Sequence, residues 1–355
     1  MTLDTLGWTP FFADAFNQLN LEGTIAARVF RQDKQSYLVV NERGEYTATL
    51  LGRLLYAEDV DLPTVGDWVA IEPFDGEQAV VHDLLPRFSE FARKEVGQKT
   101  RRQVVAANVN TVFLVSGLDK DFNLRRIERY LIQTVSSGAK PIIVLNKVDL
   151  CDDLQAHIAE VERIATGVDI ISLSATEGSG IDQLHALMAP GETVAFIGSS
   201  GVGKSSLVNR LVGYEYLKTG AVREDDSRGR HTTSHRELVV LPTGGLVMDT
   251  PGMRELQLWG DEDDLNEVFD DINLLSANCR FNDCQHESEP GCAILEAIER
   301  GDIDEDRYLS YQKLKREIAF MDRKKGEASI MKSRKHDKSL GKLYKSIQKN
   351  NPKRF

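Results

Sequence analysis

The chain has 355 residues, of which 41% are hydrophobic and 28% are charged, and its formal net charge is −11. This composition is typical of a soluble globular protein with two or three domains. No apolar run approaches the roughly 20 residues that a bilayer crossing requires. The N-terminus lacks the basic and then apolar pattern of a signal peptide. We therefore expect a cytoplasmic protein that does not contact a membrane.

The charge is distributed unevenly along the chain. Residues 313–355 contain 15 Lys and Arg against 4 Asp and Glu, an excess of +11, so residues 1–312 carry −22. An acidic body with a basic tail favours a polyanionic partner, and the alternative is a solvated tail with no partner. We assign residues 321–355 to a basic C-terminal tail.

The first third of the chain predicts a small β-barrel. Residues 23–85 contain five β-rich segments, which read GTIAARVF, SYLVV, EYTATLLGRLL, VGDWVAI and QAVVHDLL. Turn residues separate them in NERG and FDG. Five short strands without an intervening helix favour a barrel such as an OB-fold. The polar, mostly basic stretch 86–103 is interpreted as a linker, so residues 1–100 are assigned to an OB-like barrel and its linker.

From about residue 104, apolar segments alternate with helical patterns. Strands are expected at VNTVFLVS, PIIVLN, VDIISLS and TVAFIG, and helices at 123–138, 152–166, 180–188 and from 203 onward. ELVVLP and GLVMDT predict a hairpin around TGG. Near-continuous apolar strands between helices imply a buried, largely parallel sheet in an α/β fold. We assign residues 101–262 to this domain and residues 263–320 to a mainly helical one.

Residues 198–206 read GSSGVGKSS and match the phosphate-loop pattern G-x-x-x-x-G-K-[ST]. The segment follows a predicted strand and opens a predicted helix, as this motif requires. Backbone N–H groups and the helix N-terminus then face the phosphates, whereas a glycine-rich turn without a ligand is the alternative. We expect Lys204 to reach the β- and γ-phosphates and Ser205 to ligate Mg²⁺. The candidate phosphate-binding residues are Gly198, Ser199, Ser200, Gly201, Val202, Gly203, Lys204, Ser205 and Ser206.

A base-reading motif, NKVD, follows the strand PIIVL. The carboxylate of Asp149 can accept hydrogen bonds from N1–H and the amino group of guanine, whereas adenine offers it no such donors, so one Asp can select GTP over ATP. Lys147 can lay its aliphatic stem over the base. The candidate base-binding residues are Asn146, Lys147, Val148 and Asp149, with Ser174 and Ala175 from the segment SLSAT.

Two further segments carry candidate γ-phosphate sensors and Mg²⁺ ligands. In DTPG, Asp249 can hold Mg²⁺ through water and the Gly252 N–H can meet the γ-phosphate; in GRHTTS, either Thr232 or Thr233 can complete Mg²⁺ coordination. Met253 occupies the position where a water-orienting Gln is common in GTPases. We therefore predict slow intrinsic hydrolysis, with the water oriented by His231 or by a partner. The candidate catalytic residues are His231, Thr232, Thr233, Asp249 and Gly252.

Three of the four cysteines lie within 14 residues of one another, with a histidine among them. The pattern C-x4-C-x-H-x5-C comprises Cys279, Cys284, His286 and Cys292. In a cytosolic chain, metal binding is favoured over disulfides, and three thiolates with one imidazole form a closed tetrahedral set. We expect one structural Zn²⁺ per chain, and reduced free thiols are the alternative. Cys151 is interpreted as structural.

These motifs in this order resemble one family, the circularly permuted GTPases called RsgA, YjeQ or YloQ. The resemblance covers nearly the whole chain, including DFNLRRIERYL, NKVD, GSSGVGKSS, GRHTTS, DTPGMRE and the cysteine cluster. It implies GTP and GDP binding with Mg²⁺, a zinc site, and hydrolysis stimulated by the small ribosomal subunit. It also implies a cytoplasmic monomer that acts in late 30S maturation and contacts 16S rRNA, without DNA or membrane partners. His231 matches a histidine proposed to assist hydrolysis in this family.

Two other interpretations stay open: a metabolic P-loop enzyme such as a small-molecule kinase, and a diverged RNA-binding paralogue whose nucleotide site is structural. Base recognition by NKVD argues against a kinase. The motif order also has a consequence, because rotating it restores the usual order with the phosphate loop first. DTPG then becomes the last element of the domain. We hypothesise that loss of the γ-phosphate is transmitted from Gly252 to the zinc-binding region.

Overall fold

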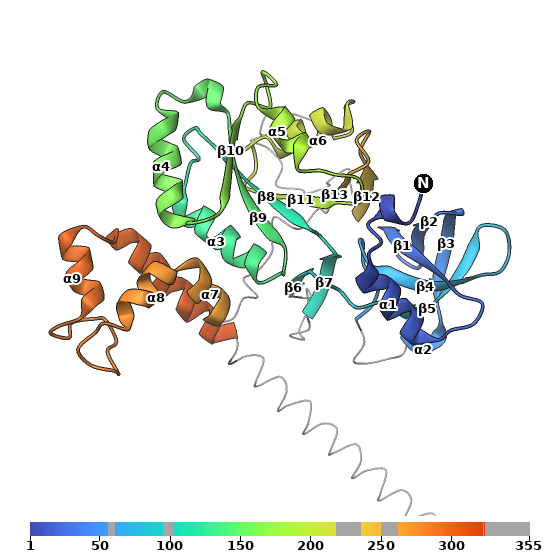
Figure 1. Ribbon diagram of the computed structural model, residues 1–355, viewed down its shortest axis with the longest axis horizontal. Helices are drawn as coiled ribbons and strands as arrows, with labels where there is room; N and C mark the ends of the chain where they lie inside the picture. Colours follow the sequence, from blue (N-terminus) through green and yellow to red (C-terminus); the bar gives the residue numbers. More distant parts are fainter. Residues whose placement is uncertain (56–60, 95–101, 218–235, 250–261, 322, 324–355) are drawn as a thin grey trace, which may run out of the picture.

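The computed structural model describes residues 1–55, 61–94, 102–217, 236–249, 262–321 and 323. Three parts follow one another along the chain: an N-terminal β-barrel, a central α/β unit, and a C-terminal group of helices (Figure 1). The expected fold class is confirmed. Every helix within these ranges falls short of the length and hydrophobicity that a bilayer crossing requires.

The barrel contains the five strands expected from the sequence. They are β1 (Ile25–Gln32), β2 (Tyr37–Asn41), β3 (Gly44–Leu50), β4 (Trp68–Pro73) and β5 (Gln78–Leu84). Strand β4 pairs with both β5 and β1, which closes the barrel. The third segment ends as a strand at Leu50, because the chain turns there into the short helix α2 (Gly52–Leu55).

An N-terminal helix, α1 (Pro10–Leu19), packs against the barrel beside the short 3-10 helix η1 (Asp4–Leu6). Pro10 occupies the first turn, where its missing N–H costs no hydrogen bond. Trp8 and Phe12 lie against Trp68 of β4, with ring centroids 4.6 Å and 5.8 Å from it. Phe12 and Trp68 belong to the apolar cluster that the barrel shares with the α/β unit, so the N-terminal residues help to join these two parts.

The stretch 86–103 is not the simple linker that the sequence suggested. Strand β6 (Glu90–Lys94) pairs antiparallel with β7 (Arg102–Ala107) in a separate two-stranded sheet. Phe91 and Ala92 of β6 are buried, whereas the charged residues Glu90 and Arg93 beside them are half-buried. Such charges are common on short exposed ribbons, which is why the composition resembled that of a linker.

The α/β unit has the expected parallel sheet. Its strands are β8 (Thr111–Gly117), β9 (Lys140–Asn146), β10 (Asp169–Leu173), β11 (Thr193–Ile197), β12 (Arg236–Val240) and β13 (Leu246–Asp249). The spatial order β10-β9-β8-β11-β13 is parallel throughout, and β12 runs antiparallel to β13 as the predicted hairpin. The connections between its strands include the short 3-10 helix η2 (Val148–Leu150) and the short α-helix α5 (Ile181–Ala186).

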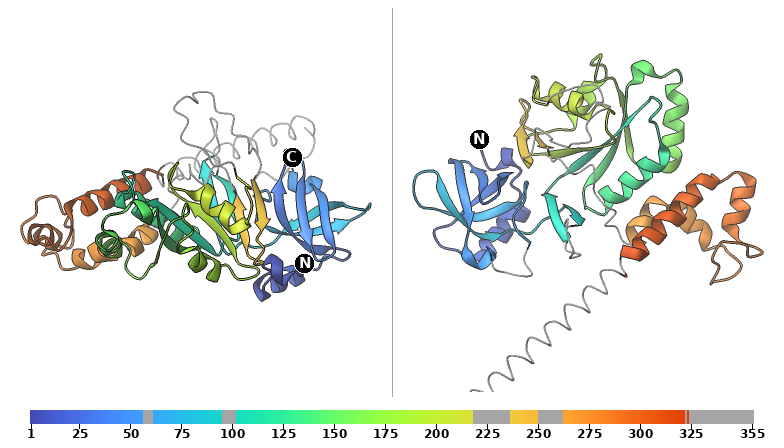
Figure 2. Two further views of the ribbon diagram at one scale, coloured as in Figure 1. Left: turned by 90° about the horizontal axis from the view of Figure 1, so that it is seen from above. Right: turned by 180° about the vertical axis from the view of Figure 1, so that it is seen from behind.

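Helices cover both faces of this sheet (Figure 2). Helices α3 (Leu124–Val135) and α4 (Leu154–Ile164) pack on one face through Ile127, Leu131 and Val161. Helix α6 (Lys204–Val212) packs with α5 on the other face. Because side chains alternate along a strand, Leu114 faces α3 while Phe113 faces α6. This is the three-layer arrangement that places ligand sites at the carboxyl ends of the strands.

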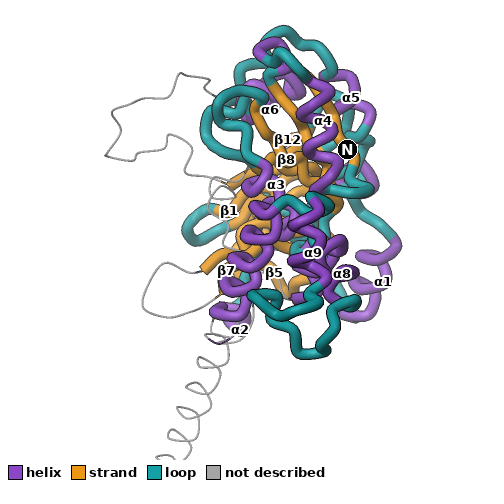
Figure 3. The backbone as a smooth tube through the Cα atoms, turned by 90° about the vertical axis from the view of Figure 1, so that its left-hand side faces the viewer, coloured by secondary structure: helices purple, strands orange, loops and turns teal. Residues whose placement is uncertain are grey.

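The C-terminal helices form a third core next to α3 (Figure 3). They are α7 (Glu262–Val268), α8 (Asp270–Ser276), α9 (Ala293–Arg300) and a longer helix over residues 305–321. Ile132 of α3 belongs to the same apolar cluster as Phe269 and Ile294. The helical character expected after residue 260 is therefore confirmed for the residues described.

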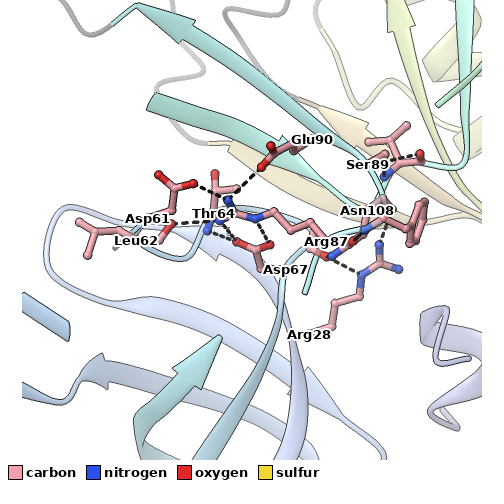
Figure 4. A network of polar contacts seen from close by, with 12 residues as sticks. Arg28, Asp61, Leu62, Thr64, Asp67, Arg87, Ser89, Glu90 and Asn108 are labelled. Carbon is pink, nitrogen blue, oxygen red and sulfur yellow. Dashed lines mark hydrogen bonds and ion pairs between the residues drawn. The ribbon is translucent and has the colours of Figure 1, made fainter. Parts of the chain in front are cut away.

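The barrel and the α/β unit are joined by pairing and by buried charges. Strand β1 pairs with β12, so the two sheets are continuous. Arg28 of β1 is buried and donates hydrogen bonds to the carbonyls of Leu6, Gly66 and Asn108. Close by, Arg87 donates to both carboxylate oxygens of the buried Asp67, at 2.8 Å each (Figure 4).

Candidate functional site

The phosphate loop lies between β11 and α6, as expected. Gly201 and Gly203 have φ of +82° and +101°, values that side chains rarely adopt. A Cβ on Gly203 would collide with the amide of Asn146, and one on Gly198 with the carbonyl of Val115. The loop therefore needs glycine at these positions, and its close approach to β8 and β9 sets where phosphates would lie.

Lys204 begins α6 and folds back over the loop. Its side chain is buried, and its Nζ donates to the carbonyls of Gly198 and Ser199 at 2.7 Å and 2.5 Å. The ammonium group thus sits inside the loop that phosphates would enter. Ser205 follows in the first turn of α6 and is half-buried. A lysine ammonium can donate hydrogen bonds to nucleotide phosphates, and a serine hydroxyl oxygen can ligate Mg²⁺. Their placement at a helix N-terminus suits both roles.

Asn146 ties the base-reading motif to the phosphate loop. It ends β9, is 1% exposed, and has both ends of its amide hydrogen-bonded. Its Nδ2 donates to the Val202 carbonyl at 2.7 Å, and its Oδ1 accepts from the Ala175 N–H at 2.9 Å. One buried side chain therefore fixes three segments that are 27 or more residues apart in sequence.

The other residues of the base-reading motif extend from this anchor. Lys147 has φ of +67°, and its Nζ donates to Asp119 at 2.5 Å. Val148 and Asp149 lie in η2, and Asp149 is exposed. Ser174 is buried, and its hydroxyl accepts a hydrogen bond from the Glu177 N–H. The Ser174 hydroxyl thus shapes the turn, while the backbone N–H of Ala175 is bonded to Asn146.

The sequence reasoning missed a group of polar residues near this site. Asp119 and Asp121 lie in the loop after β8, Arg126 lies in the first turn of α3, and Arg210 lies on α6. Arg126 donates to Asp121 at 2.6 Å and to the Ser199 hydroxyl at 2.8 Å. The hydrogen bond from Arg126, followed by that from Ser199, holds the pKa of Asp121 below its usual value. Asp119 and Asp121 follow the carboxyl end of a predicted parallel strand, where ligands bind in such sheets, and this position could have indicated them from the sequence.

Several predicted catalytic residues lie outside the described residues. These are His231, Thr232, Thr233 and Gly252, and Met253 with them. Asp249 is described: it ends β13, opposite Glu237 of β12, and is half-buried. The basic tail is also outside the described ranges, apart from residues 321 and 323.

The four predicted metal ligands converge between α8 and α9. One ligand atom from each of Cys279, Cys284, His286 and Cys292 lies within 4.8 Å of all the others. The Nδ1 of His286 is 3.4 Å from the sulfurs of Cys279 and Cys292, which are 4.0 Å apart. Zinc bond lengths in a tetrahedron require about 3.6 Å between N and S and about 3.8 Å between two S atoms. The cluster is therefore compatible with zinc, and its cysteines form no disulfide.

Comparisons with known proteins agree with this geometry. Residues 84–259 match the family model described as RsgA GTPase. The chain is 49% identical to the small ribosomal subunit biogenesis GTPase RsgA of Opitutus terrae, over 91% of this chain and 92% of that protein. It is 45% identical to RsgA 1 of Oceanobacillus iheyensis, over 91% of this chain and 94% of that protein.

Two solved structures have a similar fold. YjeQ from Thermotoga maritima aligns with a TM-score of 0.62 and 28% identity, covering 83% of this chain and 99% of that one. YloQ, described as a circularly permuted GTPase, aligns with a TM-score of 0.60 and 24% identity, covering 84% of this chain and 96% of that one.

Proposed function

Since the chain belongs to the RsgA GTPase family, we propose that it is a GTP-hydrolysing switch acting in late maturation of the 30S ribosomal subunit. Its curated relatives are named small ribosomal subunit biogenesis GTPases. The observation that carries the proposal is Asn146 of the base-reading motif, whose buried amide donates to Val202 in the phosphate loop and accepts from the Ala175 N–H in the loop after β10. That link fits a site that reads the base and the phosphates of one nucleotide together.

We assign the following roles to the residues of the site. Asp149 selects guanine, Lys147 covers the base, and Ala175 completes the base pocket with Ser174 shaping its turn. The loop from Gly198 to Ser206 wraps the phosphates, with Lys204 on the β- and γ-phosphates. Ser205 ligates Mg²⁺, which neutralises charge on the phosphates when bound.

Hydrolysis in this proposal is slow in the isolated protein and faster on the subunit. Met253 cannot orient water by hydrogen bonding, so His231 or a group from the ribosome does so. Asp249, Gly252 and one of Thr232 and Thr233 respond to the γ-phosphate. The cluster of Cys279, Cys284, His286 and Cys292 would hold one structural zinc ion, and the barrel and zinc-binding region would contact 16S rRNA as a monomer. The proposed parts are residues 1–100, 101–262, 263–320 and 321–355.

GTP turnover with and without purified 30S subunits tests this function. We expect less than about 1 turnover per second for the protein alone and a clear stimulation by subunits. Binding of ATP and GTP with equal affinity would instead favour a metabolic P-loop enzyme. Wild-type subunit binding that is the same with GDP and with a non-hydrolysable GTP analogue, and that Lys204→Ala leaves unchanged, would favour an RNA-binding protein with a structural nucleotide site.

Asp149→Asn tests the base assignment separately. An amide cannot accept both guanine hydrogen bonds, so GTP affinity should fall while xanthosine triphosphate affinity rises. Asp152→Asn, which changes a nearby acidic residue outside the motif, is the matched control. Unchanged GTP affinity in Asp149→Asn would show that Asp149 does not read the base.

A further inference from the structure

The first turn of α3 holds the start of the phosphate loop. Asn123 caps the helix by accepting a hydrogen bond from the Arg126 N–H. The Arg126 side chain donates to Asp121 and to the hydroxyl of Ser199, and the Ser199 hydroxyl also donates to Asp121. Each of these three side chains contacts the other two. Ser199 is the second residue of the phosphate loop, so α3 and the loop cannot shift independently without breaking this group.

The adjoining side of the same helix binds the C-terminal helices through ion pairs. Arg129 makes a two-pronged contact with Glu317, at 2.9 Å and 2.7 Å. Arg125 contacts Asp304 at 2.8 Å. The hydrogen bond from Arg129 lowers the pKa of Glu317, which is therefore charged at neutral pH. These contacts fall on the long helix 305–321 and on the residue just before it.

A buried ion pair lies at the centre of this contact. Glu128 of α3 is 0% exposed, and its Oε1 accepts from Arg307 at 2.9 Å and from Arg125 at 2.5 Å. Arg307 also makes a two-pronged contact with Asp271 of α8. Separating the C-terminal helices from α3 would deprive Glu128 of Arg307. A buried carboxylate that loses a partner is costly unless water replaces it.

The interface therefore combines ion pairs with apolar packing. Ile132 is the residue of α3 that enters the apolar cluster of the C-terminal helices, and Ser136 adds a hydrogen bond to Asp264 at 2.7 Å. Ionic interfaces of this kind are specific in geometry but sensitive to small displacements and to salt. A helix that holds the phosphate loop at one end thus holds a displaceable group of helices along its side.

We propose that α3 couples the phosphate loop to the C-terminal helices, with Arg126 and Asp121 acting as positioning residues through Ser199. This inference rests on the proposed GTP site. Nucleotide phosphates order the loop, the ordered Ser199 fixes the first turn of α3, and Arg125, Glu128 and Arg129 then hold residues 304–317 in register. The coupling is reciprocal, so loosening the C-terminal helices must also weaken nucleotide binding. This route lies entirely within the described residues, unlike the expected route through Gly252.

A double-mutant cycle on nucleotide release tests the coupling. The probe is the fluorescent analogue mant-GDP with Mg²⁺, and its dissociation rate is measured by stopped flow for the full chain. We expect Arg126→Ala to raise the rate about five- to tenfold, as loss of charge-assisted hydrogen bonds to the loop implies. Arg129→Ala, remote from the loop, should raise it about two- to threefold. In the double variant, Arg129→Ala should have no further effect.

Arg53→Ala is the matched control, since Arg53 forms an exposed ion pair with Asp83 in the barrel. If Arg126→Ala does not fold, Ser199→Ala takes its place in the cycle. This variant removes only the hydroxyl oxygen that contacts Arg126 and Asp121. An unchanged rate in Arg129→Ala, or effects that simply multiply in the double variant, would overturn the coupling. Failure of the wild-type protein to bind mant-GDP, or equal binding of mant-ADP, would instead contradict the proposed GTP site.

Hydrogen exchange gives an independent measurement on the C-terminal helices. In the wild-type protein, exchange over residues 293–321 should be slower with GDP bound than without nucleotide. In Arg126→Ala, at GDP concentrations that saturate the variant, this difference should disappear. Equal protection with and without GDP in the wild-type protein would refute the role of α3.

Discussion

Arg210 shows how a single side chain can connect the two halves of the candidate nucleotide site. It lies on the helix that follows the phosphate loop, yet its guanidinium reaches the loop after β10. Its Nε donates to the Ala175 carbonyl at 2.5 Å, and its Nη2 donates to the Thr176 carbonyl. Ala175 in turn donates its N–H to Asn146. The loop after β10 is therefore hydrogen-bonded to both Arg210 and Asn146.

Arg210→Ala should weaken GTP binding without unfolding the protein. A hydrogen bond to a charged group contributes about 1.5–3 kcal/mol, and the exposure of Arg210 reduces its share toward the lower figure. We expect the Kd for GTP to rise about tenfold, measured by titration calorimetry. Arg163→Ala, which changes an exposed arginine in the last turn of α4, is the control. Equal Kd values in the two variants would show that the carbonyl contacts do not shape the site.

At the scale of elements, the metal cluster links α8 to α9 through a loop with little packing of its own. Cys292 is 2% exposed and directly precedes α9, while Cys279 lies just beyond α8. His286 has φ of +60°, and its carbonyl accepts a hydrogen bond from Tyr308 at 2.9 Å. A bound ion would fix this loop and bring the two helices together, because binding energy at structural zinc sites is also folding energy.

Cys292→Ser should remove the zinc and loosen this region. We expect zinc content to fall from one ion per chain to near zero, and hydrogen exchange over residues 279–300 to accelerate. Cys151→Ser is the matched control, because Cys151 is the one cysteine outside the cluster. A strong chelator should reproduce the Cys292→Ser result in the wild-type protein. Full zinc content in Cys292→Ser, or none in the wild-type protein, would contradict the assignment.

The elements that could be predicted from the sequence are those whose signal is local. Alternating apolar residues predicted β1 to β5, and the run from strand to glycine-rich loop to helix placed the phosphate loop. Strand β6 was not predicted because its charged residues outnumber its two buried apolar residues, Phe91 and Ala92. Helix α1 escaped although Thr9 and Pro10 form a usual helix start.

The contacts that escaped prediction depend on the tertiary fold. Arg126 and Ser199 are 73 residues apart, and Arg129 and Glu317 are 188 apart. The apolar pattern of α3 predicts which of its faces packs on the sheet, and it gives no partner for the charged residues of the helix. In the structure, Glu128, one of these charged residues, is buried because the C-terminal helices cover it. No spacing rule within the helix indicates which distant segment does so.

At the scale of the whole molecule, the barrel is an extension of the α/β sheet. Strand β1 pairs with β12 at Arg31 and Glu237, and β12 pairs with β13, which ends at Asp249. The apolar cluster that contains Trp68 of the barrel also contains Leu114 of β8. Shared strands and a shared core favour cooperative unfolding of the two parts.

Arg28 is the polar anchor of this joint. It is 1% exposed, and its guanidinium donates to the carbonyls of Leu6, Gly66 and Asn108 at 2.5, 3.2 and 3.0 Å. Figure 4 shows Arg28 beside Asn108. Burial lowers the pKa of Arg28 to about 9, so it remains protonated at neutral pH. The three acceptors come from the N-terminal residues, the barrel and the start of the α/β unit. Arg28→Met keeps much of the aliphatic stem but removes the donor from the carbonyls of Leu6 and Asn108, whereas Gly66 still accepts from Asn108 Nδ2 at 3.1 Å.

We expect Arg28→Met to lower the free energy of unfolding by about 3 kcal/mol or more, because each buried acceptor left unpaired costs about 1–3 kcal/mol. In urea, the barrel of this variant should unfold at a lower concentration than the α/β unit. Trp8 and Trp68 report on the barrel when Trp259 is replaced by Phe, and circular dichroism reports on the whole chain. The fluorescence and circular dichroism transitions should coincide in Trp259→Phe alone and when Arg53→Ala is added to it. When Arg28→Met is added, fluorescence should change at a lower urea concentration than circular dichroism. Coincident transitions in Arg28→Met would mean that the β1–β12 pairing and the shared apolar cluster hold the barrel to the α/β sheet without Arg28.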